Sequence, residues 1–409
     1  MQLEERDGVF SGLAVLAFCW AVVGPLTMKF FADQGAKVIR VETSRRPCVM
    51  RTSAPYKDNV PNYNRGGYFN YYNANILSLS LNMERPEARR IAKRLAVECD
   101  VFMENYTPGV MEKWGLSYDE LKKDRPDIIM MRQSGYGSWG PYANLPAFGM
   151  VLVPIAGLPN FIGWPGKEPL PVGVSAYTDC ISPRFATAAL IAALDYRKRT
   201  GKGQLLDLSQ FETAIYFIAP GVLDFAVNGR EPARIGNSSP DAAPHGVYPC
   251  RGDDRWCTIA VTDDGEWASL CREIGRPEYI QDSRFDTFAH RKQNEEELNR
   301  LIGEWTAGLA AEDVMERLQA VGVPAGVVEN TADVFDDPQL RKRNMYWPMQ
   351  HSEMGMFTHL GQSFQLSKTP SRAYSPSPLL GEHTEYVCTN ILGMSDTEFI
   401  DLMQKGVFE

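Results

Sequence analysis

Short apolar runs and longer amphipathic segments alternate along the first third of the chain, a pattern that predicts strands and helices in turn. The apolar runs have the length of buried strands and lie at residues 13–18, 36–42, 76–83, 100–105 and 127–137. The expected helices between them lie at residues 25–34, 85–98 and 117–126. Strands that alternate with helices usually pair in parallel through right-handed crossovers, so the pattern predicts a parallel α/β sheet.

The chain changes character after about two hundred residues. An apolar helix at 183–194 is followed, at 228–246, by a loop rich in Gly, Pro and Ser. The next part mixes short strands with helices, which are expected at 263–275, 292–307 and 310–321. We therefore expect a large α/β domain over 8–225, a smaller α+β domain over 226–330, and a return to the large domain over 331–409.

Residues 8–28 carry no charge and form a run long enough to span a membrane. Gly24 and Pro25 interrupt this run, and no cluster of Lys or Arg flanks it. Pro25 suits the first position of a helix, and Gly35 suits the position just past its end. We interpret the segment as a strand, a turn and a helix rather than a membrane span.

The composition is that of a globular protein, with 44% hydrophobic and 23% charged residues among 409. A net charge of −9 argues against a nucleic-acid partner, which a basic domain usually reveals. The eight cysteines form no CxxC pair and complete no zinc signature with histidine. The acidic start of the chain is unlike a secretory signal, so reduced thiols in a cytoplasmic protein without a metal site are the simplest expectation.

Several common catalytic signatures are missing from the sequence. No GxGxxG or GxxxxGK[ST] follows the first strand, which argues against a dinucleotide site and a P-loop. No GxSxG elbow is present, which argues against a serine hydrolase. The histidines lie mostly in expected loops or polar stretches, where surface or structural roles are more common than catalysis. They are His245, His290, His351, His359 and His383.

Three segments are candidates for contact with a ligand. The basic clusters at 40–47 and 195–203 are either solvated loops or a seat for phosphate groups. The stretch 134–142 holds three glycines within six residues. It is either a plain turn or a loop whose backbone approaches a ligand. Asn105 ends an expected strand, and ligands of open α/β sheets bind at the carboxyl ends of strands. Asn105 and the glycine loop are therefore expected at the same edge of the sheet.

Asp179 stands between a run of small and apolar residues and the expected apolar helix. As an N-cap it would stabilise that helix by about 1 kcal/mol. A position near a helix N-terminus also holds a carboxylate as an anion and aims it. A carboxylate nucleophile forms anhydrides or thioesters with acyl groups. The residues alone leave both roles open, the cap and the nucleophile.

Five motifs match those of a known family. They are the stretches 12–42, 103–143 and 174–212, "APHGVYPC" at 243–250 and "LLGEHT" at 379–384. Together they resemble the class III (family III) CoA-transferases, which share a fold with the α-methylacyl-CoA racemases. The resemblance covers nearly the whole chain. It implies a Rossmann-like large domain built from both chain ends, a small domain, and two chains that interlock like links.

By this resemblance Asp179 is the catalytic aspartate of a CoA-transferase. It would attack the thioester of a donor acyl-CoA, form a mixed anhydride, and then carry CoA as an aspartyl thioester until the acceptor acid takes it. The acyl-CoA and the carboxylic acid are substrates, and no permanently bound cofactor is implied. The residues expected to bind CoA are Val22, Arg40, Arg45, Arg46, Asn105, Tyr106, Lys113, Gly135, Tyr136 and Gly137.

The chain departs from its family at several points. Many members carry a Lys-Arg pair where this chain has Ile76 and Leu77, and a Gln or Arg where it has Val22. The racemases carry a histidine where this chain has Phe148, so a racemase or epimerase would lack one of its two bases. A third hypothesis is a non-catalytic, CoA-binding subunit of a heteromeric transferase. The intact motif around Asp179 argues against it.

The segment 148–170 is expected to contact the acyl groups, and it is apolar and aromatic. Its large side chains include Phe148, Met150, Phe161 and Trp164. Such a lining suits a bulky hydrophobic acid, while the same side chains suit a packed core equally well. The chain looks like the two-subunit transferases that activate aromatic succinates such as benzylsuccinate with succinyl-CoA. Carnitine, bile acid and phenyllactate acceptors stay open, as does a partner chain that is identical or a sister subunit.

Overall fold

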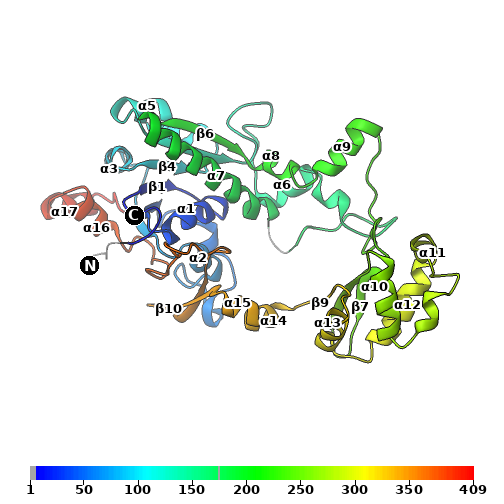
Figure 1. The fold of residues 1–409 in the computed structure, drawn as a ribbon. Helices are drawn as coiled ribbons and strands as arrows, with labels where there is room; N and C mark the ends of the chain where they lie inside the picture. The colour runs from blue at the N-terminus through cyan, green and yellow to red at the C-terminus, as the bar shows by residue number, and fades with distance from the viewer. Residues whose placement is uncertain (1–5, 174–175) are drawn as a thin grey trace. The chain divides into compact units, whose positions relative to one another are not determined.

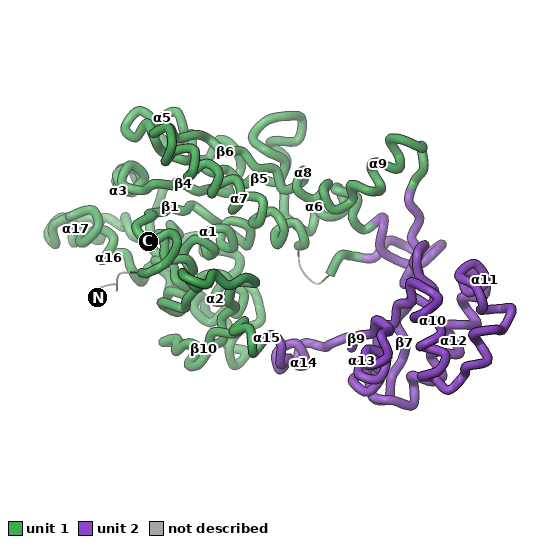
Figure 2. The backbone as a smooth tube through the Cα atoms, viewed as in Figure 1, with its two compact units in different colours: residues 1–159, 171–231, 341–409 green, residues 160–170, 232–340 purple. Residues whose placement is uncertain are grey.

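The computed structural model describes residues 6–173 and 176–409, and Figure 1 shows their fold. The chain divides into two compact units, which Figure 2 distinguishes by colour. The first unit holds the chain up to residue 159 together with 171–231 and 341–409. The second unit holds 160–170 and 232–340. Both ends of the described chain therefore belong to the first unit.

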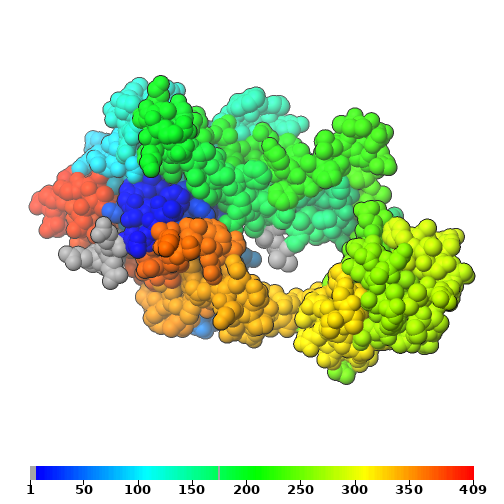
Figure 3. All heavy atoms as spheres, viewed as in Figure 1, coloured from blue at the N-terminus to red at the C-terminus, as the bar shows by residue number. Residues whose placement is uncertain are grey.

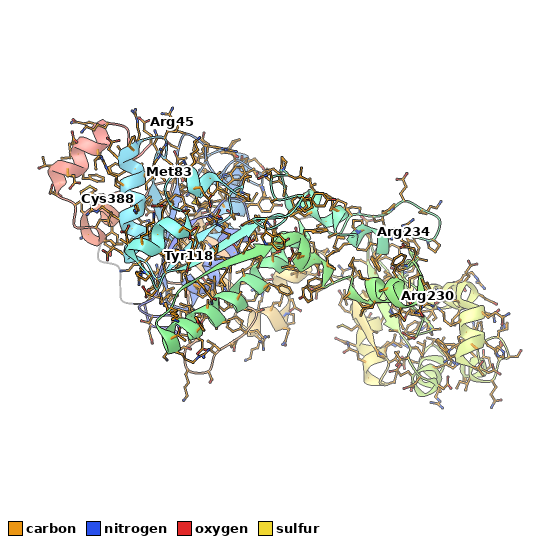
Figure 4. All side chains as sticks on the ribbon, turned by 90° about the horizontal axis from the view of Figure 1, so that it is seen from above. Arg45, Met83, Tyr118, Arg230, Arg234 and Cys388 are labelled. Carbon is orange, nitrogen blue, oxygen red and sulfur yellow. The ribbon has the colours of Figure 1, made fainter. Side chains whose placement is uncertain are left out.

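The second unit differs from the expected domain over 226–330 in two ways. It begins and ends a few residues later in the chain, and it also takes the segment 160–170. The backbone N–H of Gly236 donates to the carbonyl of Gly163 at 2.9 Å. Arg234, labelled in Figure 4, donates to the carbonyl of Lys167 at 2.9 Å. These bonds join segments about seventy residues apart, which no local pattern reveals.

A six-stranded sheet forms the centre of the first unit. Its strands are β1 (Ala14–Phe18), β2 (Lys37–Glu42), β3 (Leu77–Ser80), β4 (Val101–Glu104), β5 (Ile129–Ser134) and β6 (Gln204–Ser209). All neighbouring strands pair in parallel, in the order β3-β2-β1-β4-β5-β6. This is the doubly wound order, in which ligands bind where the order reverses, beside β1 and β4. The predicted parallel sheet is confirmed, but β6 was not predicted.

The helices of the first unit are α1 (Val23–Asp33), α2 (Gly67–Tyr72), α3 (Pro86–Glu98), α4 (Val110–Lys113), α5 (Tyr118–Asp124), α6 (Gly149–Ile155), α7 (Tyr177–Thr200), α8 (Gln210–Ile215), α9 (Ala219–Asn228), α16 (Thr384–Tyr386) and α17 (Asp396–Gln404). Of these, α1, α3 and α5 begin and end close to the predicted positions, whereas α7 extends the predicted helix 183–194 at both ends, and α2, α4, α6, α8 and α9 were not predicted. Local signals fix some of these ends. Pro86 opens α3, and the side chain of Ser117 caps α5.

Both faces of the sheet are covered by apolar side chains, because successive strand residues point to opposite faces. On the first face, Phe18 and Phe102 pack into a core shared with α3, α5 and α17. On the second face, Ala17 and Met103 pack against α1 and α7. Figure 4 labels three residues of the first-face core, which come from separate parts of the chain: Met83, Tyr118 and Cys388.

The C-terminal part of the first unit packs on its N-terminal part, and Figure 3 shows these residues, orange and blue, side by side. β10 (Tyr346–His351) and β11 (Gly355–Leu360) form an antiparallel hairpin. Lys29 forms a buried ion pair with Asp33 and donates to the carbonyl of Leu360 at 3.0 Å. Asp33 also accepts a hydrogen bond from Gln362 at 2.7 Å. These bonds fasten the returning chain to α1.

The second unit has its own sheet and core. β7 (His245–Pro249), β8 (Trp256–Ala260) and β9 (Ala325–Val327) pair antiparallel in that order. Its helices are α10 (Asp264–Glu273), α11 (Phe288–Gln293), α12 (Glu295–Thr306), α13 (Ala311–Ala320) and α14 (Thr331–Asp336), and α15 (Pro338–Lys342) spans the boundary. Trp267, Phe285 and Ile302 are buried at its centre.

Two predictions about single residue types can be compared with the structure. None of the eight cysteines forms a disulfide bond. His351, His359 and His383 are buried, which fits the structural rather than the surface role expected for the histidines. All three lie in the returning C-terminal segment of the first unit. In the described part of the chain no helix is long and apolar enough to cross a membrane.

Candidate active site

A pocket of about 90 Å³ lies at the carboxyl edge of the sheet, within the first unit. Its residues come from the β1–α1 turn, the loop after β4, the segment between β5 and α6, and the starts of α7 and α8. They are Trp20, Ala21, Val23, Asn105, Tyr106, Thr107, Pro108, Gln133, Ser134, Gly135, Ala143, Leu145, Ala147, Phe148, Gly149, Asp179 and Gln210. This is the reversal point of the strand order, where the topology predicts a ligand.

Asp179 lies in the first turn of α7 and lines this pocket. The N-cap of α7 is Ala176, and no side chain caps this end of the helix. The interpretation of Asp179 as an N-cap is therefore wrong. Burial raises the pKa of Asp179 to about 7, because the charged carboxylate loses water without gaining a nearby cation. A carboxyl group with a pKa near neutrality in a pocket is a candidate for chemistry.

The backbone of Gly149 closely approaches the carboxyl group of Asp179. A Cβ atom added at Gly149 would lie 3.0 Å from Cγ of Asp179 and 2.2 Å from Cβ of Ala176. The preceding residue, Phe148, is 55% exposed, and its ring lies 6.3 Å from that of Trp20. The carboxyl group of Asp179 therefore lies against the Gly149 backbone, in a pocket that aromatic side chains also line.

Asn105 fixes the turn between β1 and α1. Its Oδ1 accepts a hydrogen bond from the backbone N–H of Trp20, and its Nδ2 donates to the carbonyl of Trp20, both at 2.7 Å. Ala21, the next residue of the turn, has a φ of +58°, which a non-glycine residue adopts only when its surroundings hold it there. The guanidinium of Arg46 lies over the Trp20 ring at 5.3 Å. The amide of Asn105 therefore binds the backbone of the turn at Trp20 rather than a ligand. Arg46 places a positive charge next to the same turn.

The other residues expected at the CoA site are dispersed. Tyr106 lines the pocket, and Val22 is the N-cap residue of α1 between two pocket residues. Arg45 is exposed and pairs with Glu409 at 3.2 Å, and Figure 4 shows it at the edge of the unit. Lys113 is exposed at the end of α4 and does not line the pocket.

Arg40 lies inside the molecule, with 1% of its surface exposed. Its guanidinium donates to Oδ1 of Asn73 and lies over the ring of Phe69 at 5.0 Å. A parallel sheet that is covered on both faces buries even a charged residue of a central strand. The basic cluster at 40–47 therefore presents Arg45 and Arg46 at the surface, but not Arg40.

The glycine loop after β5 is divided between two pockets. Gly135 lines the Asp179 pocket, and a Cβ added there would lie 2.2 Å from Cβ of Ala147. Tyr136 and Gly137 line a separate pocket of about 450 Å³. The structure thus brings Asn105, Tyr106 and Gly135 together with Asp179, but places Tyr136 and Gly137 elsewhere.

Three buried polar residues of the Asp179 pocket were not named individually from the sequence, although Ser134 opens the glycine stretch 134–142. Gln133, Ser134 and Gln210 are more than nine-tenths buried, and Oε1 of Gln133, Oγ of Ser134 and Oε1 of Gln210 have no hydrogen-bond partner. The backbone N–H of Phe211 donates to the carbonyl of Gly135 at 2.9 Å, which places these neighbouring residues side by side. A prediction of β6 would have identified Gln210, because it directly follows that strand. Such uncommitted polar groups are suited to a polar ligand.

The chemistry available in this pocket is that of a carboxyl group among neutral polar groups. Its lining contains no histidine, lysine or arginine. Within the ranges 6–173 and 176–409, no group of His, Cys, Asp and Glu is arranged to hold a metal ion. A half-buried carboxylate in such a site can act as a nucleophile toward an acyl group.

The sequence is similar to characterised enzymes over almost its full length. It is 29% identical to the succinyl-CoA–D-citramalate CoA-transferase of Chloroflexus aurantiacus, over 94% of both chains. It is 29% identical to the succinyl-CoA–L-malate CoA-transferase beta subunit of the same organism, over 97% of both chains. The succinyl-CoA:mesaconate CoA-transferase of Haloarcula hispanica is 30% identical, over 92% of this chain and 94% of that one.

The fold also matches a solved structure. A CAIB/BAIF family protein from Brucella suis superposes with a TM-score of 0.86 at 30% identity, over 94% of this chain and 100% of that one. The model of CoA-transferase family III matches residues 10–384 of the present sequence. Family members named above transfer CoA between acids, and their substrates are CoA thioesters and carboxylic acids. This chain is a family III CoA-transferase.

Proposed function

We propose that this enzyme moves CoA from an acyl-CoA donor, with succinyl-CoA the first candidate, to a carboxylic acid through covalent intermediates on Asp179. The observation that carries the proposal is the position of Asp179. Its carboxyl group caps no helix, lines a pocket at the carboxyl edge of the sheet, and lies against the backbone of Gly149 with no side chain between them. The printed names of several relatives support succinyl-CoA as donor.

Each step of the proposed reaction exchanges one acyl bond for another. The carboxylate of Asp179 attacks the thioester carbon, the C–S bond breaks, and an anhydride and CoA thiolate result. The thiolate attacks the aspartyl carbonyl of the anhydride, which releases the donor acid and leaves an aspartyl-CoA thioester. The acceptor carboxylate then attacks that thioester, and the returning thiolate takes the acceptor acyl group and restores Asp179.

The turn from Trp20 to Val22 and the loop at Tyr106 are proposed to hold CoA. Arg46 and Arg45 lie at the surface near this turn and would face the negatively charged phosphates. Lys113 and the buried Arg40 would act at longer range through their charge, whereas Gly135 would let the backbone approach the thioester. The CoA is a substrate, and the mechanism needs no bound cofactor or metal.

We propose a bulky, apolar acid as acceptor. Trp20 and Phe148 border the Asp179 pocket, and Leu145 is 49% exposed there. Met150 is 61% exposed at the start of α6, next to Gly149. Exposed aromatic and aliphatic side chains favour an apolar ligand. Aromatic succinates, which combine an apolar ring with carboxylates, satisfy this description, and their activation would place the enzyme in aromatic acid catabolism.

The racemase or epimerase alternative is disfavoured by the same residues. A 1,1-proton transfer needs a second proton carrier opposite the first. The position of the racemase histidine is occupied here by Phe148, which has no ionisable group, and no histidine lines the pocket. A non-catalytic subunit is disfavoured by Asp179, which is free of any capping role.

We infer that the chain works as a dimer, either with itself or with a homologous sister subunit. α9 carries no buried residue although it is mostly apolar, and its exposed large side chains are Val222, Leu223, Phe225 and Val227. An exposed apolar face of this kind is usually buried against a partner. An interlocked pair would provide it, and one relative is named a beta subunit. Eight cysteines without a disulfide bond are consistent with a reducing, cytoplasmic compartment.

A donor and acceptor panel tests the proposed function. The purified chain would be incubated with succinyl-CoA and, in turn, benzylsuccinate, glutarate, citramalate and oxalate, and the new acyl-CoA measured by mass spectrometry. We expect CoA transfer to an aromatic succinate, and at least a 10³-fold loss in Asp179→Asn, which removes the nucleophile. Transfer that persists in Asp179→Asn would refute the covalent mechanism.

A further inference from the structure

Three charged residues lie side by side on neighbouring strands β4, β5 and β6 of the sheet, outside the Asp179 pocket. Glu104 of β4 is paired in register with Arg132 of β5, and Arg132 is paired with Asp207 of β6. Because alternate residues share a face, Glu104 and Arg132 lie on the face of Phe102 and Met130, opposite α7. The side chains of Glu104 and Arg132 are only 5% and 11% exposed. A buried pair of this kind, outside the pocket itself, calls for a structural or functional reason.

Glu104 and a second carboxylate, Glu112 of α4, hold the loop that borders the pocket. Oε2 of Glu104 accepts a hydrogen bond from the backbone N–H of Tyr106 at 2.8 Å. Oε2 of Glu112 accepts one from the backbone N–H of Gly109 at 3.1 Å. The loop residues between these bonds, from Tyr106 to Pro108, line the Asp179 pocket. The loop is therefore fixed at both ends by a glutamate.

Arg132 joins the two glutamates. Its Nε lies 3.3 Å from Oε1 of Glu104 as an ion pair without a hydrogen bond, and its Nη2 donates a hydrogen bond to Oε1 of Glu112. Each carboxylate thus uses one oxygen for Arg132 and the other for the loop backbone. A guanidinium suits this task, because its planar fork presents several donors in fixed directions. Lysine would offer one point charge instead.

The same row reaches the glycine loop. Asp207 lies next to Arg132 in register, and its carboxylate accepts hydrogen bonds from the backbone N–H of Ser138, at 3.0 and 3.1 Å, and from Oγ of Ser138, at 2.8 Å. The row of Glu104, Arg132 and Asp207 therefore contacts both the loop that follows β4 and the loop that follows β5.

We propose that Arg132 is a positioning residue that holds the loop from Tyr106 to Gly109 in its CoA-binding conformation by binding Glu104 and Glu112. The proposal rests on the proposed function, in which that loop contacts CoA. Arg132 itself does not line the pocket, so it acts through the loop. Loss of its charge frees both glutamates, and the loop then samples positions that no longer match CoA.

The arrangement also makes CoA binding sensitive to pH. Burial raises the pKa of Glu104 to about 7. The charged groups that act on Glu104 are Arg132, which favours its ionised form, and Glu112 and Asp207, which oppose it. The pair with Arg132 is therefore complete above pH 7 and weakens as Glu104 takes up a proton below it. We expect CoA affinity to fall below pH 7 more steeply in the wild type than in Glu104→Gln, which cannot titrate.

The test compares Arg132→Met, Arg132→Lys and Glu112→Gln in the full chain. Arg125→Met is the matched control, because Arg125 pairs with Asp100 at 3.0 Å at the opposite edge of β4, away from the pocket. CoA affinity would be measured by calorimetry, KM and kcat would be measured with succinyl-CoA, and folding would be checked by circular dichroism.

We expect Arg132→Met and Glu112→Gln to weaken CoA binding and raise KM about tenfold, as for one lost charge-assisted hydrogen bond, with kcat changed less. Arg132→Lys should recover part of the affinity, and Arg125→Met should bind as the wild type does.

Three results would overturn the proposal. The first is a CoA affinity of folded Arg132→Met that stays within twofold of the wild-type value. If Arg132→Met fails to fold, the same result in Glu112→Gln would overturn it, because the Glu112 side chain is 44% exposed and its replacement should not prevent folding. The second is an equal loss in Arg125→Met, which would indicate a general effect on the sheet. The third is a wild type that binds no CoA and transfers none, which would overturn the proposed function as well. Unchanged CoA binding in variants of an active wild type would overturn this inference alone.

Discussion

We propose that the reactivity of the pocket depends on the carboxyl group of Asp179 and on its surroundings. Asp179 has no cation that would stabilise its charge, so burial alone sets its pKa. Gly149 contributes backbone without a side chain at the point of closest approach. Burial keeps the carboxyl group easily protonated, which a capping aspartate would not be, and the absence of a side chain at Gly149 lets the backbone approach it without a clash.

Substitution of Gly149 by alanine should crowd Asp179. The new Cβ would approach Cγ of Asp179 to 3.0 Å, so either the carboxyl group or α6 must shift. We expect a loss of about 1–3 kcal/mol in stability from overpacking and a rate reduction on the order of 10²-fold from misplacement of the carboxyl group. Gly303→Ala is the control, because its Cβ would meet only an ordinary contact at 3.7 Å. Equal activity in the two variants would contradict the proposed closeness of Gly149 to the reacting group.

The rate of acyl transfer to Asp179 should depend on pH. Only the ionised carboxylate attacks, so single-turnover adduct formation should rise with pH and level off above about 7. Stability should change in the opposite sense. Since the folded-state pKa is raised above the ordinary 3.8, the contribution of Asp179 to stability is complete below about pH 4 and is lost as the pH rises toward 7. A rate that is flat between pH 5 and 9, measured by rapid quench, would contradict a nucleophile with this pKa.

At the scale of secondary structure, the site depends on elements that are far apart in the sequence. The turn after β1, the loop after β4 and the starts of α7 and α8 meet because the strand order places their carboxyl ends together. The returning C-terminal segment fixes α1, which follows the first of these turns, through the buried pair of Lys29 and Asp33.

Removal of Lys29 should loosen this attachment. Burial raises the pKa of Asp33, while Lys29 and Gln362 favour its ionised form. In Lys29→Met the carboxylate would remain buried without its cation, and we expect a loss of about 3–5 kcal/mol in the free energy of unfolding by urea. The double variant with Asp33→Asn should recover part of that loss. A Lys29→Met protein as stable as the wild type would show that the pair does not anchor the segment.

Elements with a strong period or a capping signal were predictable from the sequence, and edge or long-range features were not. The strands up to β5 and helices α1, α3 and α5 were located because their apolar runs and turn residues are local. β6 was missed because it is an edge strand in which Leu206 and Leu208 are only partly buried against the core of the second face, so its apolar pattern is weak. The segment 160–170 joins the second unit through contacts that no local pattern reveals.

The residues of the candidate site divide in the same way, into those with a local sequence signal and those without one. Asp179, Asn105 and Gly135 were identified because they follow strands or precede a helix, and the structure brings them together. Arg40 was expected to face phosphates, but the double cover of the sheet buries it. Gln210 had no signal of its own, since its polarity matters only once β5 and β6 are neighbours.

At the scale of the whole molecule, the exposed apolar face of α9 indicates a partner. Leu223 is 63% exposed and Val227 is 78% exposed, on a helix with no buried residue. Large apolar side chains in such numbers mark an interface rather than a solvated surface.

The purified chain should therefore have twice its monomer mass of 45.8 kDa in light scattering at micromolar concentration. The double substitution Leu223→Lys and Val227→Lys should convert this dimer to a monomer, because it places charge where apolar contact is needed. Glu316→Lys, on α13 of the second unit, changes charge elsewhere and is the control. A wild-type chain that stays monomeric would contradict the homodimer and direct attention to a sister subunit.

The covalent role of Asp179 can be tested most directly by trapping. The protein would be incubated with succinyl-CoA, quenched with hydroxylamine or borohydride, and examined by intact mass and peptide mapping. The account predicts a modification confined to the peptide that contains Asp179, absent from Asp179→Asn. A protein that binds CoA and transfers it but shows no adduct on that peptide would contradict the central claim.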